Sequence, residues 1–437
     1  MTETGAPTAA AVERTKSGKT KLTSAQITGF LAAWIGWILD GMDSFIYALV
    51  LSPALGELLP KSGYAATTEN IGFAGSIMFA LFLIGWGMAF LWGPIADRFG
   101  RTRTLAATIL VYSVFTGAAA FAQDVWQLAI FRLLAGVGVG GEWAIAGTYV
   151  AEMLPEDRRK FAGGLLNSGY YIGFFIASAL NYTVGTSLGW RAMFLCGLAP
   201  VVVGLYTLYR VKEPERWTRQ AEGAKRYNQL AVVFRPPYLK RTVVMTTLLS
   251  CSIIGLWAGS VYAPTAIRIL STKAGMSAAE ATQMASFGAA LLSLVTIVGN
   301  LVLPFFAERL GRRPTLALYF TGMLTGIVLA FGWAFYLPNG LVPFFLILVL
   351  LGLSGGNFAI YNIWLPEQYE TKVRATAFAF AISFGRFVAA GVNFILAAGI
   401  REMGTLGIPI ALTAVAFAIG LIVLPFSTET KGRTLPD

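Results

Sequence analysis

Five charged residues interrupt the most apolar stretches of this 437-residue chain, and their types could support proton or anion chemistry. They are Asp40 and Asp43 in WILDGMDSF, Arg132 and Glu142 at the two ends of a glycine-rich run, and Arg386 in SFGRFVAAG. A charge in apolar surroundings is costly unless it is paired or hydrated, so each residue requires a role. Because the chain contains no histidine, reversible protonation near neutral pH would depend on carboxyl groups.

Asp40 and Asp43 lie three residues apart. In a helix this spacing places them on one face, with Cβ atoms about 5–6 Å apart. Two carboxylates that close together raise the proton affinity of at least one of them. Such a group can take up a proton on one side of a barrier and release it on the other. Either aspartate could be the carrier, and the alternative role is a permanent buried ion pair or a cap.

The elements that position these residues are predicted to be membrane-spanning helices. The chain has 56% hydrophobic and 13% charged residues and a mean hydropathy of +0.66, which exclude an ordinary soluble protein. A spanning helix needs about 20 mainly apolar residues. Twelve such segments are predicted, at 27-52, 71-93, 104-122, 125-150, 161-184, 191-209, 242-263, 284-307, 314-336, 341-364, 375-399 and 404-426. The expected fold is an all-α membrane protein.

The basic residues are distributed unevenly between the predicted loops. With a cytosolic N-terminus, 26 of the 33 Lys and Arg residues fall in cytosolic segments, whereas the outer loops hold five. This bias predicts that both termini are cytosolic. The net charge of +11 then reflects topology and contact with anionic lipid, so no nucleic-acid partner is expected. Without a cleavable leader, a bacterial cytoplasmic membrane is the expected location.

A loop sequence occurs twice along the chain. GPIADRFGRTR occupies residues 93-103 and PFFAERLGRRP residues 304-314, and Asp97 and Glu308 are 211 residues apart. Pro155 and Pro366 show the same offset, which indicates two six-helix halves in one orientation. The predicted parts are a tail at 1-26, a first bundle at 27-209, a linker at 210-241, a second bundle at 242-426 and a tail at 427-437.

The repeated loops combine a carboxylate with several guanidinium groups beside a helix end. Such groups can lock neighbouring helices through charge-assisted hydrogen bonds and release them when the helices separate. The candidate cytosolic gate residues are Asp97, Arg98, Arg101, Glu308, Arg309 and Arg312. The alternative is that these charges only set the topology.

With these two loops, three further segments resemble the major facilitator superfamily, in particular its sugar porters, aromatic-acid and sialic-acid proton symporters, and organic-ion transporters. The segments are RLLAGVGVGGEW at 132-143, EPERW at 213-217 and TETKGRTL at 428-435. The resemblance implies two bundles around a central cavity that opens to either side in turn. Helices one, four, seven and ten should line the cavity, with contributions from helices five, eight and eleven.

The same resemblance assigns roles to the charges inside the helices. Asp43 and Arg132 match a pair that interacts in proton-coupled sugar porters, so protonation of Asp43 would break the pair. The D-G-x-D pattern that begins at Asp40, and Glu142 within its GGE segment, resemble transporters of acids. Glu142 would lie about three helical turns closer to the cytosol than Arg132, where it could receive the proton, or it could be a packing residue.

Arg386 bears on the choice of substrate. It lacks an evident acidic partner within helices seven to twelve, and a carboxylate substrate could form a bidentate pair with it. A pair with Asp40 or Asp43 across the halves and simple packing are the alternatives. Candidate cavity walls are the polar and aromatic residues at mid-depth, Trp37, Tyr47, Asn167, Tyr170, Tyr171, Trp257, Tyr262, Asn357, Tyr361, Asn362 and Asn393.

These observations predict proton-coupled symport of a small organic acid anion. The alternatives are a sugar or polyol symporter, although helix seven lacks the paired glutamines of sugar porters, an exporter of drugs or organic ions, and a transporter-like sensor. Enzyme activity is not expected, because no catalytic group of residues and no phosphate-binding loop is evident. Cys196 and Cys251 lie in apolar segments and suggest no metal site. We expect a monomer without a cofactor, driven by protons, with sodium as the alternative ion.

Overall fold

A computed structural model describes residues 21–213, 232–236 and 238–432 of the chain, and this part is helical with no strand. The first half contains α1 (Ser24–Lys61), α2 (Thr68–Gly87), η1 (Met88–Leu91), α3 (Trp92–Phe99), α4 (Arg101–Ala118), η2 (Ala119–Phe121), α5 (Val125–Met153), α6 (Glu156–Leu180), η3 (Asn181–Gly185), α7 (Thr186–Cys196) and α8 (Ala199–Arg210). The second half contains α11 (Leu239–Lys273), α12 (Ala278–Arg309), α13 (Arg312–Ile327), η4 (Val328–Trp333), η5 (Ala334–Tyr336), α14 (Leu341–Gly355), η6 (Gly356–Ala359), α15 (Ile360–Gln368), α16 (Thr371–Met403), α17 (Gly407–Leu412), α18 (Val415–Val423) and η7 (Leu424–Phe426).

Over the described residues these elements form the twelve crossings that the sequence predicts. Ten helical runs satisfy the length and hydropathy of a membrane span. One of them, Ser168–Arg210, contains two crossings because its backbone turns at Gly189, where φ is 80°. The remaining crossing is the 29-residue α5. The chain is therefore a multi-pass membrane protein.

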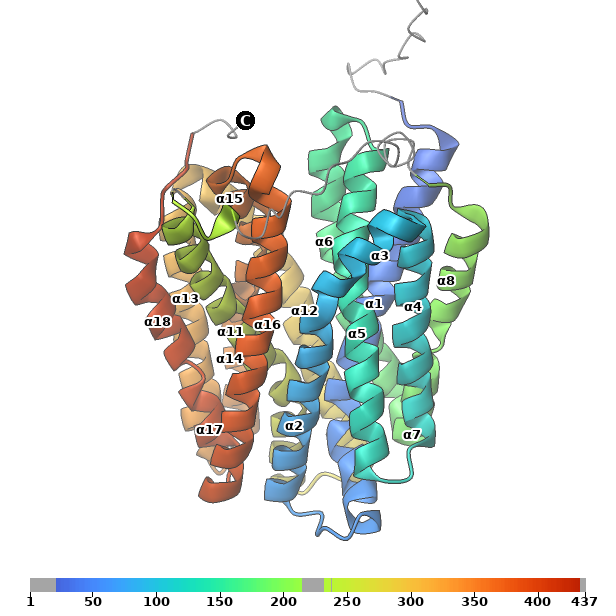
Figure 1. Cartoon of the computed structure of the whole chain (residues 1–437). Helices are drawn as coiled ribbons and strands as arrows, with labels where there is room; N and C mark the ends of the chain where they lie inside the picture. The colour runs from blue at the N-terminus through green and yellow to red at the C-terminus, as the bar shows by residue number, and fades with distance from the viewer. Residues whose placement is uncertain (1–20, 214–231, 237, 433–437) are drawn as a thin grey trace, which may run out of the picture.

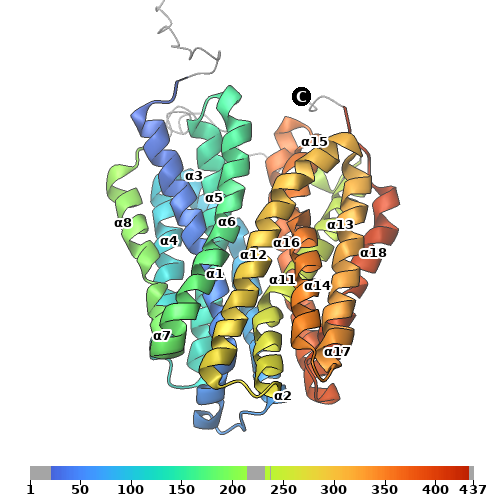
Figure 2. The ribbon, with the colours of Figure 1, turned by 180° about the vertical axis from the view of Figure 1, so that it is seen from behind.

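The crossings form two bundles that pack side by side (Figures 1 and 2). Contacts between the bundles run mainly through α2 against α16 and through α6 against α12. The start of α1 and the end of η7 lie at the same end of the molecule, which we call the tail side (Figure 1). The end at which α2 begins is the far side.

Helix ends are set by local capping and differ from the predicted spans. α1 begins at Ser24 because Thr23 and Gln26 form a reciprocal capping box, with distances of 3.3 and 3.0 Å. It continues past the predicted residue 52 to Lys61, where Glu57 pairs with Lys61 at 2.7 Å and Arg191 at 2.6 Å. Hydropathy does not detect this polar turn, which explains the error in the boundary.

Each repeated loop has a glycine in a backbone conformation that favours glycine. Gly100 has φ 107° and Gly311 has φ 104°, and the two are 211 residues apart, the offset found in the sequence. A Cβ on Gly100 would lie 2.3 Å from Glu213 Oε1, and one on Gly311 would lie 2.9 Å from Glu429 Oε2. A larger residue would therefore be strained and would also collide with a carboxylate.

These two carboxylates cap the helices that follow the glycines. Glu213 accepts hydrogen bonds from the backbone N–H groups of Thr102 and Arg103, at the start of α4. Glu429 accepts them from Arg312 at 3.0 Å and Arg313 at 2.9 Å, at the start of α13. A helix N-terminus favours such an anion. Glu213 thus fastens the segment after α8 to the first bundle, and Glu429 fastens the segment after η7 to the second bundle.

Candidate functional site

A small cavity lies where the two bundles meet, with a volume of about 40 Å³. Its walls combine aromatic rings, two aliphatic side chains and one guanidinium group, from Trp37, Trp86, Tyr170, Tyr171, Ile253, Leu256, Trp257, Phe358 and Arg386. Trp37, Tyr170, Tyr171, Trp257 and Arg386 were predicted from the sequence. The volume is far below the roughly 300–1,000 Å³ of a typical small-molecule pocket, so the walls are drawn together in this conformation.

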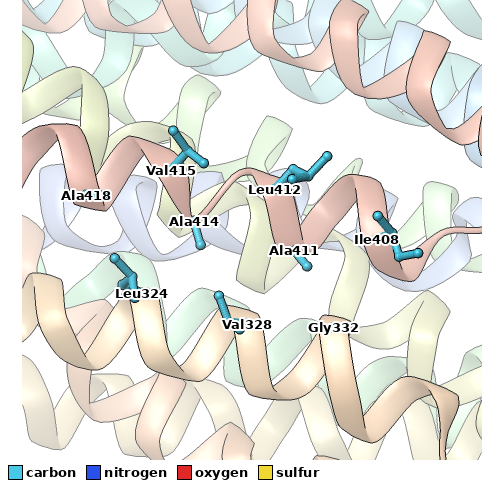
Figure 3. A pocket seen from close by; sticks show the side chains of 9 residues that line it. All are labelled: Leu324, Val328, Gly332, Ile408, Ala411, Leu412, Ala414, Val415 and Ala418. Carbon is cyan, nitrogen blue, oxygen red and sulfur yellow. The ribbon is translucent and has the colours of Figure 1, made fainter.

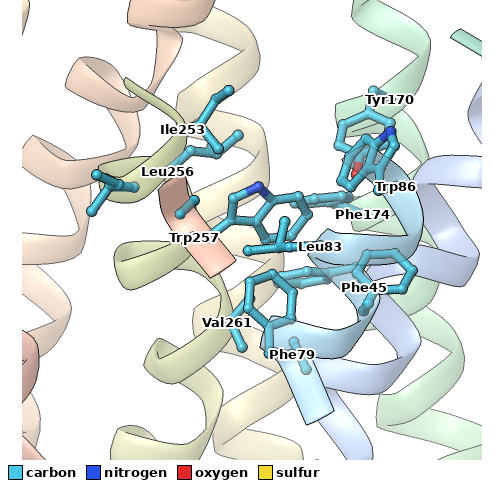
Figure 4. Packing of buried hydrophobic residues seen from close by; sticks show 14 of the residues in the cluster. Phe45, Phe79, Leu83, Trp86, Tyr170, Phe174, Ile253, Leu256, Trp257 and Val261 are labelled. Atoms are coloured by element: carbon cyan, nitrogen blue, oxygen red, sulfur yellow. The ribbon is translucent and has the colours of Figure 1, made fainter. Parts of the chain in front are cut away.

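Aromatic rings of the cavity walls and of the adjacent core pack against one another at the junction between the bundles (Figure 4). Trp86 of α2 lies edge-on to Trp257 of α11, with ring centroids 5.5 Å apart, and 6.2 Å from Tyr170 of α6. Trp37 lies 4.9 Å from Tyr170. These offset and edge contacts are the arrangements that aromatic pairs prefer.

Four lining residues were missed from the sequence: Trp86, Ile253, Leu256 and Phe358. Trp86 belongs to helix two, which was not expected to line the cavity, whereas helix four was expected there but supplies none of the nine lining residues. The available signal was Gly-Trp-Gly at residues 85-87. A Cβ on Gly85 would meet the Leu133 carbonyl at 2.2 Å, and one on Gly87 would meet Phe387 at 2.9 Å. The glycines permit close packing on both sides of the tryptophan.

Arg386 is buried in the cavity wall with a relative exposure of 5%. Its guanidinium carbon lies 4.1 Å from the centroid of the Trp86 ring, a cation–π contact. It also interacts electrostatically with Tyr170 and with Asp40 of the first bundle. The guanidinium group is therefore placed both to meet an anion in the cavity and to attract Asp40 across the junction, the two roles that the sequence left open.

Three buried carboxyl groups gather beside the cavity in the first bundle. Asp40, Asp43 and Glu142 are each at most 1% exposed, and they interact electrostatically with one another. None of their oxygens accepts a well-formed hydrogen bond from the described residues. Glu142 Oε1 lies 2.4 Å from the position that a Cβ on Gly36 would take, so this carboxyl group is pressed against α1. The sequence prediction thus brought together three groups that the fold also clusters.

Arg132 is held by aromatic rings. Its guanidinium carbon lies 4.4 Å from the centroid of Tyr47 and 4.5 Å from that of Phe82. Arg132 and Asp43 attract each other electrostatically, but no ion pair joins these two described residues. The rings lessen the cost of the buried cation. The predicted Asp43–Arg132 pair is therefore open in this conformation, and its closure stays a prediction.

Six of the predicted wall residues that the structure describes lie outside the cavity lining. Asn357 Nδ2 donates to the Ser354 carbonyl at 2.9 Å, and the Tyr361 and Ser252 hydroxyls lie 2.9 Å apart, all within the second bundle. Tyr47 donates to the Gly75 carbonyl at 3.1 Å. Asn393 and Tyr262 belong to the far-side closure described below, and Asn362 is exposed. The side chains of Asn167 and of Asp97, a predicted gate residue, lie outside the described residues.

Hydrogen bonds close the bundles against each other on the far side. The Tyr262 hydroxyl of α11 lies 2.8 Å from the Ser76 hydroxyl of α2 and donates to Asn393 Oδ1 at 2.9 Å. Asn181 donates to Ser286 at 2.8 Å, joining η3 to α12. Ser76 follows the far-side start of α2 by two turns, and Asn181 follows the end of α6. Both contacts therefore hold the far side closed.

The predicted gate charges of the second bundle are tied within that bundle. Arg312 is 5% exposed and pairs with both oxygens of Glu367, at 3.0 and 2.8 Å, and with Glu308 at 3.0 Å. These bonds join α12, α13 and α15. The guanidinium of Arg309 lies over the Phe305 ring at 4.2 Å, and that of Arg98 over Phe99 at 5.3 Å. Arg101 begins α4. A latch between the two bundles stays a prediction.

A second, larger groove lies on the outside of the second bundle, between α13, η4, α17 and α18 (Figure 3). Its volume is about 380 Å³, and its lining consists of Leu324, Val328, Gly332, Ile408, Ala411, Leu412, Ala414, Val415 and Ala418. This lining offers no polar side chain to orient an ion. The groove is an apolar surface and lies apart from the charged groups.

Comparison with known proteins agrees with this architecture. The sequence profile of the Major Facilitator Superfamily matches residues 33–392. A probable 4-methylmuconolactone transporter of Cupriavidus pinatubonensis is 30% identical over 93% of this chain and 92% of its own length. The niacin transporter NiaP of Acinetobacter baylyi is 26% identical over 97% and 98%. The crystal structure of a D-xylose-proton symporter has a TM-score of 0.72 at 19% identity, covering 94% of this chain and all of that chain.

Proposed function

Because this chain belongs to the Major Facilitator Superfamily and is a transporter rather than an enzyme, we propose that it is a proton-coupled symporter of a small organic acid anion. The substrate would bind between the bundles and would be exposed to each side in turn. We propose that the carrier works as a monomer without a cofactor, and that a proton gradient drives it.

The single observation that carries the anion assignment is Arg386 in the wall of an aromatic cavity at the bundle junction. A guanidinium group binds a carboxylate through two parallel hydrogen bonds, and aromatic rings stack on a flat, unsaturated body. The names of the relatives, 4-methylmuconolactone and niacin transporters, fit a ring-bearing acid. Hydroxyl-rich sugars suit such walls less well, because their hydroxyls need acceptors as well as donors, and no carboxylate or amide side chain is among the lining residues.

Substrate entry requires the walls to move apart. Pockets for small molecules are typically about 300–1,000 Å³, much larger than the present cavity of about 40 Å³. We propose that the tail side faces the cytosol, as the basic loops favour, and that the protein resides in a bacterial inner membrane. The far-side hydrogen bonds then describe a carrier that is closed to the outside.

Proton coupling is assigned to the carboxyl cluster. Asp43 is the proposed carrier, with Asp40 as the alternative and Glu142 on the path toward the cytosol. Protonation removes one negative charge from a cluster that has no hydrogen-bonded cation among the described residues, so loading of the proton makes the buried state less costly. Release of the proton would let ionised Asp43 turn toward Arg132.

Uptake of radiolabelled ring carboxylates, short organic acids and sugars into proteoliposomes tests the proposal. We expect acid uptake that depends on an inward proton gradient and falls at least about tenfold in Arg386→Ala. Arg401→Ala is the matched control, because Arg401 lies on the same helix but is exposed. Sugar uptake, or acid uptake that ignores both the gradient and Arg386, would overturn the proposal.

A further inference from the structure

Asp43 lies against a break in the crossing formed by α7 and α8. α7 ends at Cys196 and α8 begins at Ala199. Between them the backbone forms short-range bonds, from Gly197 N to the Phe194 carbonyl and from Leu198 N to the Leu195 carbonyl, each 3.0 Å. Pro200 follows in the first turn of α8 and has no N–H group. The Cys196 carbonyl therefore lacks the donor that a regular helix would supply four residues later.

The carboxyl group of Asp43 reaches this backbone because residue 197 is glycine. A Cβ on Gly197 would lie 2.9 Å from Asp43 Oδ1 and 2.5 Å from the Thr116 methyl carbon. Asp43 is 1% exposed, and neither of its oxygens accepts a well-formed hydrogen bond from the described residues. The Thr116 side chain of α4 is the nearest hydrogen-bonding group to the carboxyl group. A buried acid without a well-formed hydrogen bond thus lies against a place where a helix ladder is interrupted.

Charged and titratable groups reach Asp43 from each element packed around it. They are Asp40 on α1, Tyr112 on α4, Arg132 and Glu142 on α5, and Cys196 at the end of α7. Among these, Arg132 is the one cation, and it is held between two rings. The broken helix offers the opposite chemistry, because carbonyl oxygens repel a carboxylate and accept a hydrogen bond from a protonated acid.

We propose that the break at Gly197–Pro200 is the second partner of Asp43 in the transport cycle. Protonated Asp43 donates a hydrogen bond to a backbone carbonyl that Pro200 leaves without a donor. Ionised Asp43 withdraws from the break and turns toward Arg132. This inference rests on the proposed function, since it takes Asp43 as the proton carrier. The crossing formed by α7 and α8, which packs on α4, would then respond to the protonation state of Asp43.

The test is the pH dependence of acid uptake into proteoliposomes with Gly197→Ala, Pro200→Ala and Gly204→Ala. The first substitution places a methyl group between Asp43 and the break, and the second restores the missing N–H donor. Both should lower the midpoint pH of uptake by about one unit, because the protonated form loses a hydrogen bond. Gly204→Ala is the matched control in the same crossing, where a Cβ meets only side-chain carbons of Ile109 and Leu110, at 3.1 and 3.2 Å.

The outcomes separate this inference from the proposed function. If Asp43→Asn abolishes proton dependence but Gly197→Ala and Pro200→Ala keep the midpoint of Gly204→Ala, or raise it, the break is not a partner of Asp43 and symport stands. If Asp43→Asn leaves proton dependence unchanged, the premise itself is wrong. Pro200→Ala adds no bulk, so its midpoint pH alone tests the inference if Gly197→Ala does not fold. Substrate counterflow at equal pH checks that each variant is competent.

Discussion

Two buried charge clusters, the Arg312 network in the second bundle and the carboxyl cluster in the first, differ in how well their groups are hydrogen-bonded. In the second bundle, Arg312 bonds to Glu367 and Glu308, and the Thr430 hydroxyl donates to Glu367 at 2.5 Å. In the first bundle, the carboxyl groups beside the cavity have no well-formed hydrogen bond from the described residues. Satisfied buried charges hold helices together, whereas unsatisfied ones are costly and persist where a function needs them. We expect this difference if the Arg312 network stabilises the second bundle and the carboxyl cluster carries out the proposed proton coupling.

The largest expected effect comes from the unsatisfied group Asp43. Asp43→Asn removes the proton-binding carboxyl group and keeps its size, so gradient-driven uptake should fall at least about tenfold while counterflow continues. Uptake and counterflow in proteoliposomes measure the two rates. Asp124→Asn is the control, because Asp124 caps α5 and asparagine caps equally well. Equal loss in both variants would show that the effect is not specific to the buried carboxyl cluster.

Arg312→Ala should lower the stability of the fold and should leave the proposed proton coupling unchanged. It leaves Glu367, which is 11% exposed, without its cation, and breaking a buried pair in this way costs about 3–5 kcal/mol. Thermal unfolding in detergent should show the loss, and the pH midpoint of any remaining uptake should match the wild type. Arg309→Ala removes an exposed neighbour and should unfold nearly as the wild type does. A shifted midpoint in Arg312→Ala would assign this network to coupling.

Tyr262→Phe should loosen the closure between the bundles. It removes the hydroxyl that joins Ser76 to Asn393, a loss of about 1 kcal/mol that favours opening of the far side about fivefold. Spin labels at residues 65 and 274 report the separation of the bundles on that side. Tyr336→Phe is the control, since the Tyr336 hydroxyl bonds to Thr405 within the second bundle. No difference between the two variants would show that the closure does not depend on Tyr262.

The smallest expected effect is the pH response of the hydrogen bonds between Glu429 and the start of α13. Burial opposes ionisation of Glu429, but backbone N–H groups of Arg313, Arg312, Lys431 and Thr430 outweigh it and lower its pKa. A depressed pKa contributes stability above the unfolded value, about 4.3, and the contribution is lost as the pH falls through the folded value. The protection factors for hydrogen exchange at the start of α13, which are corrected for the intrinsic rate at each pH, should therefore fall in acid. In Glu429→Gln they should already be lower at neutral pH and should lack this step.

The sequence predicted the crossings and the repeat because both follow from local patterns of hydropathy and spacing. It also brought out Asp40, Asp43 and Arg386, since charges in apolar segments are conspicuous. It missed Trp86, because an indole within an apolar helix is ordinary until a partner helix is placed beside it. Asn357 and Tyr361 were expected in the cavity, but their hydrogen bonds turn them to neighbours within their own bundle. The sequence of one helix does not show which polar group on a neighbouring helix will be its hydrogen-bond partner.

The contracted cavity has a consequence for energy conservation. A carrier that binds protons and is empty of substrate dissipates the gradient if water and protons can pass through its resting form. Here the space between the bundles, about 40 Å³, is walled mostly by aromatic and aliphatic side chains. If the carrier is coupled to protons as we propose, we expect these walls to interrupt a continuous file of water, so that an idle transporter would not leak the gradient.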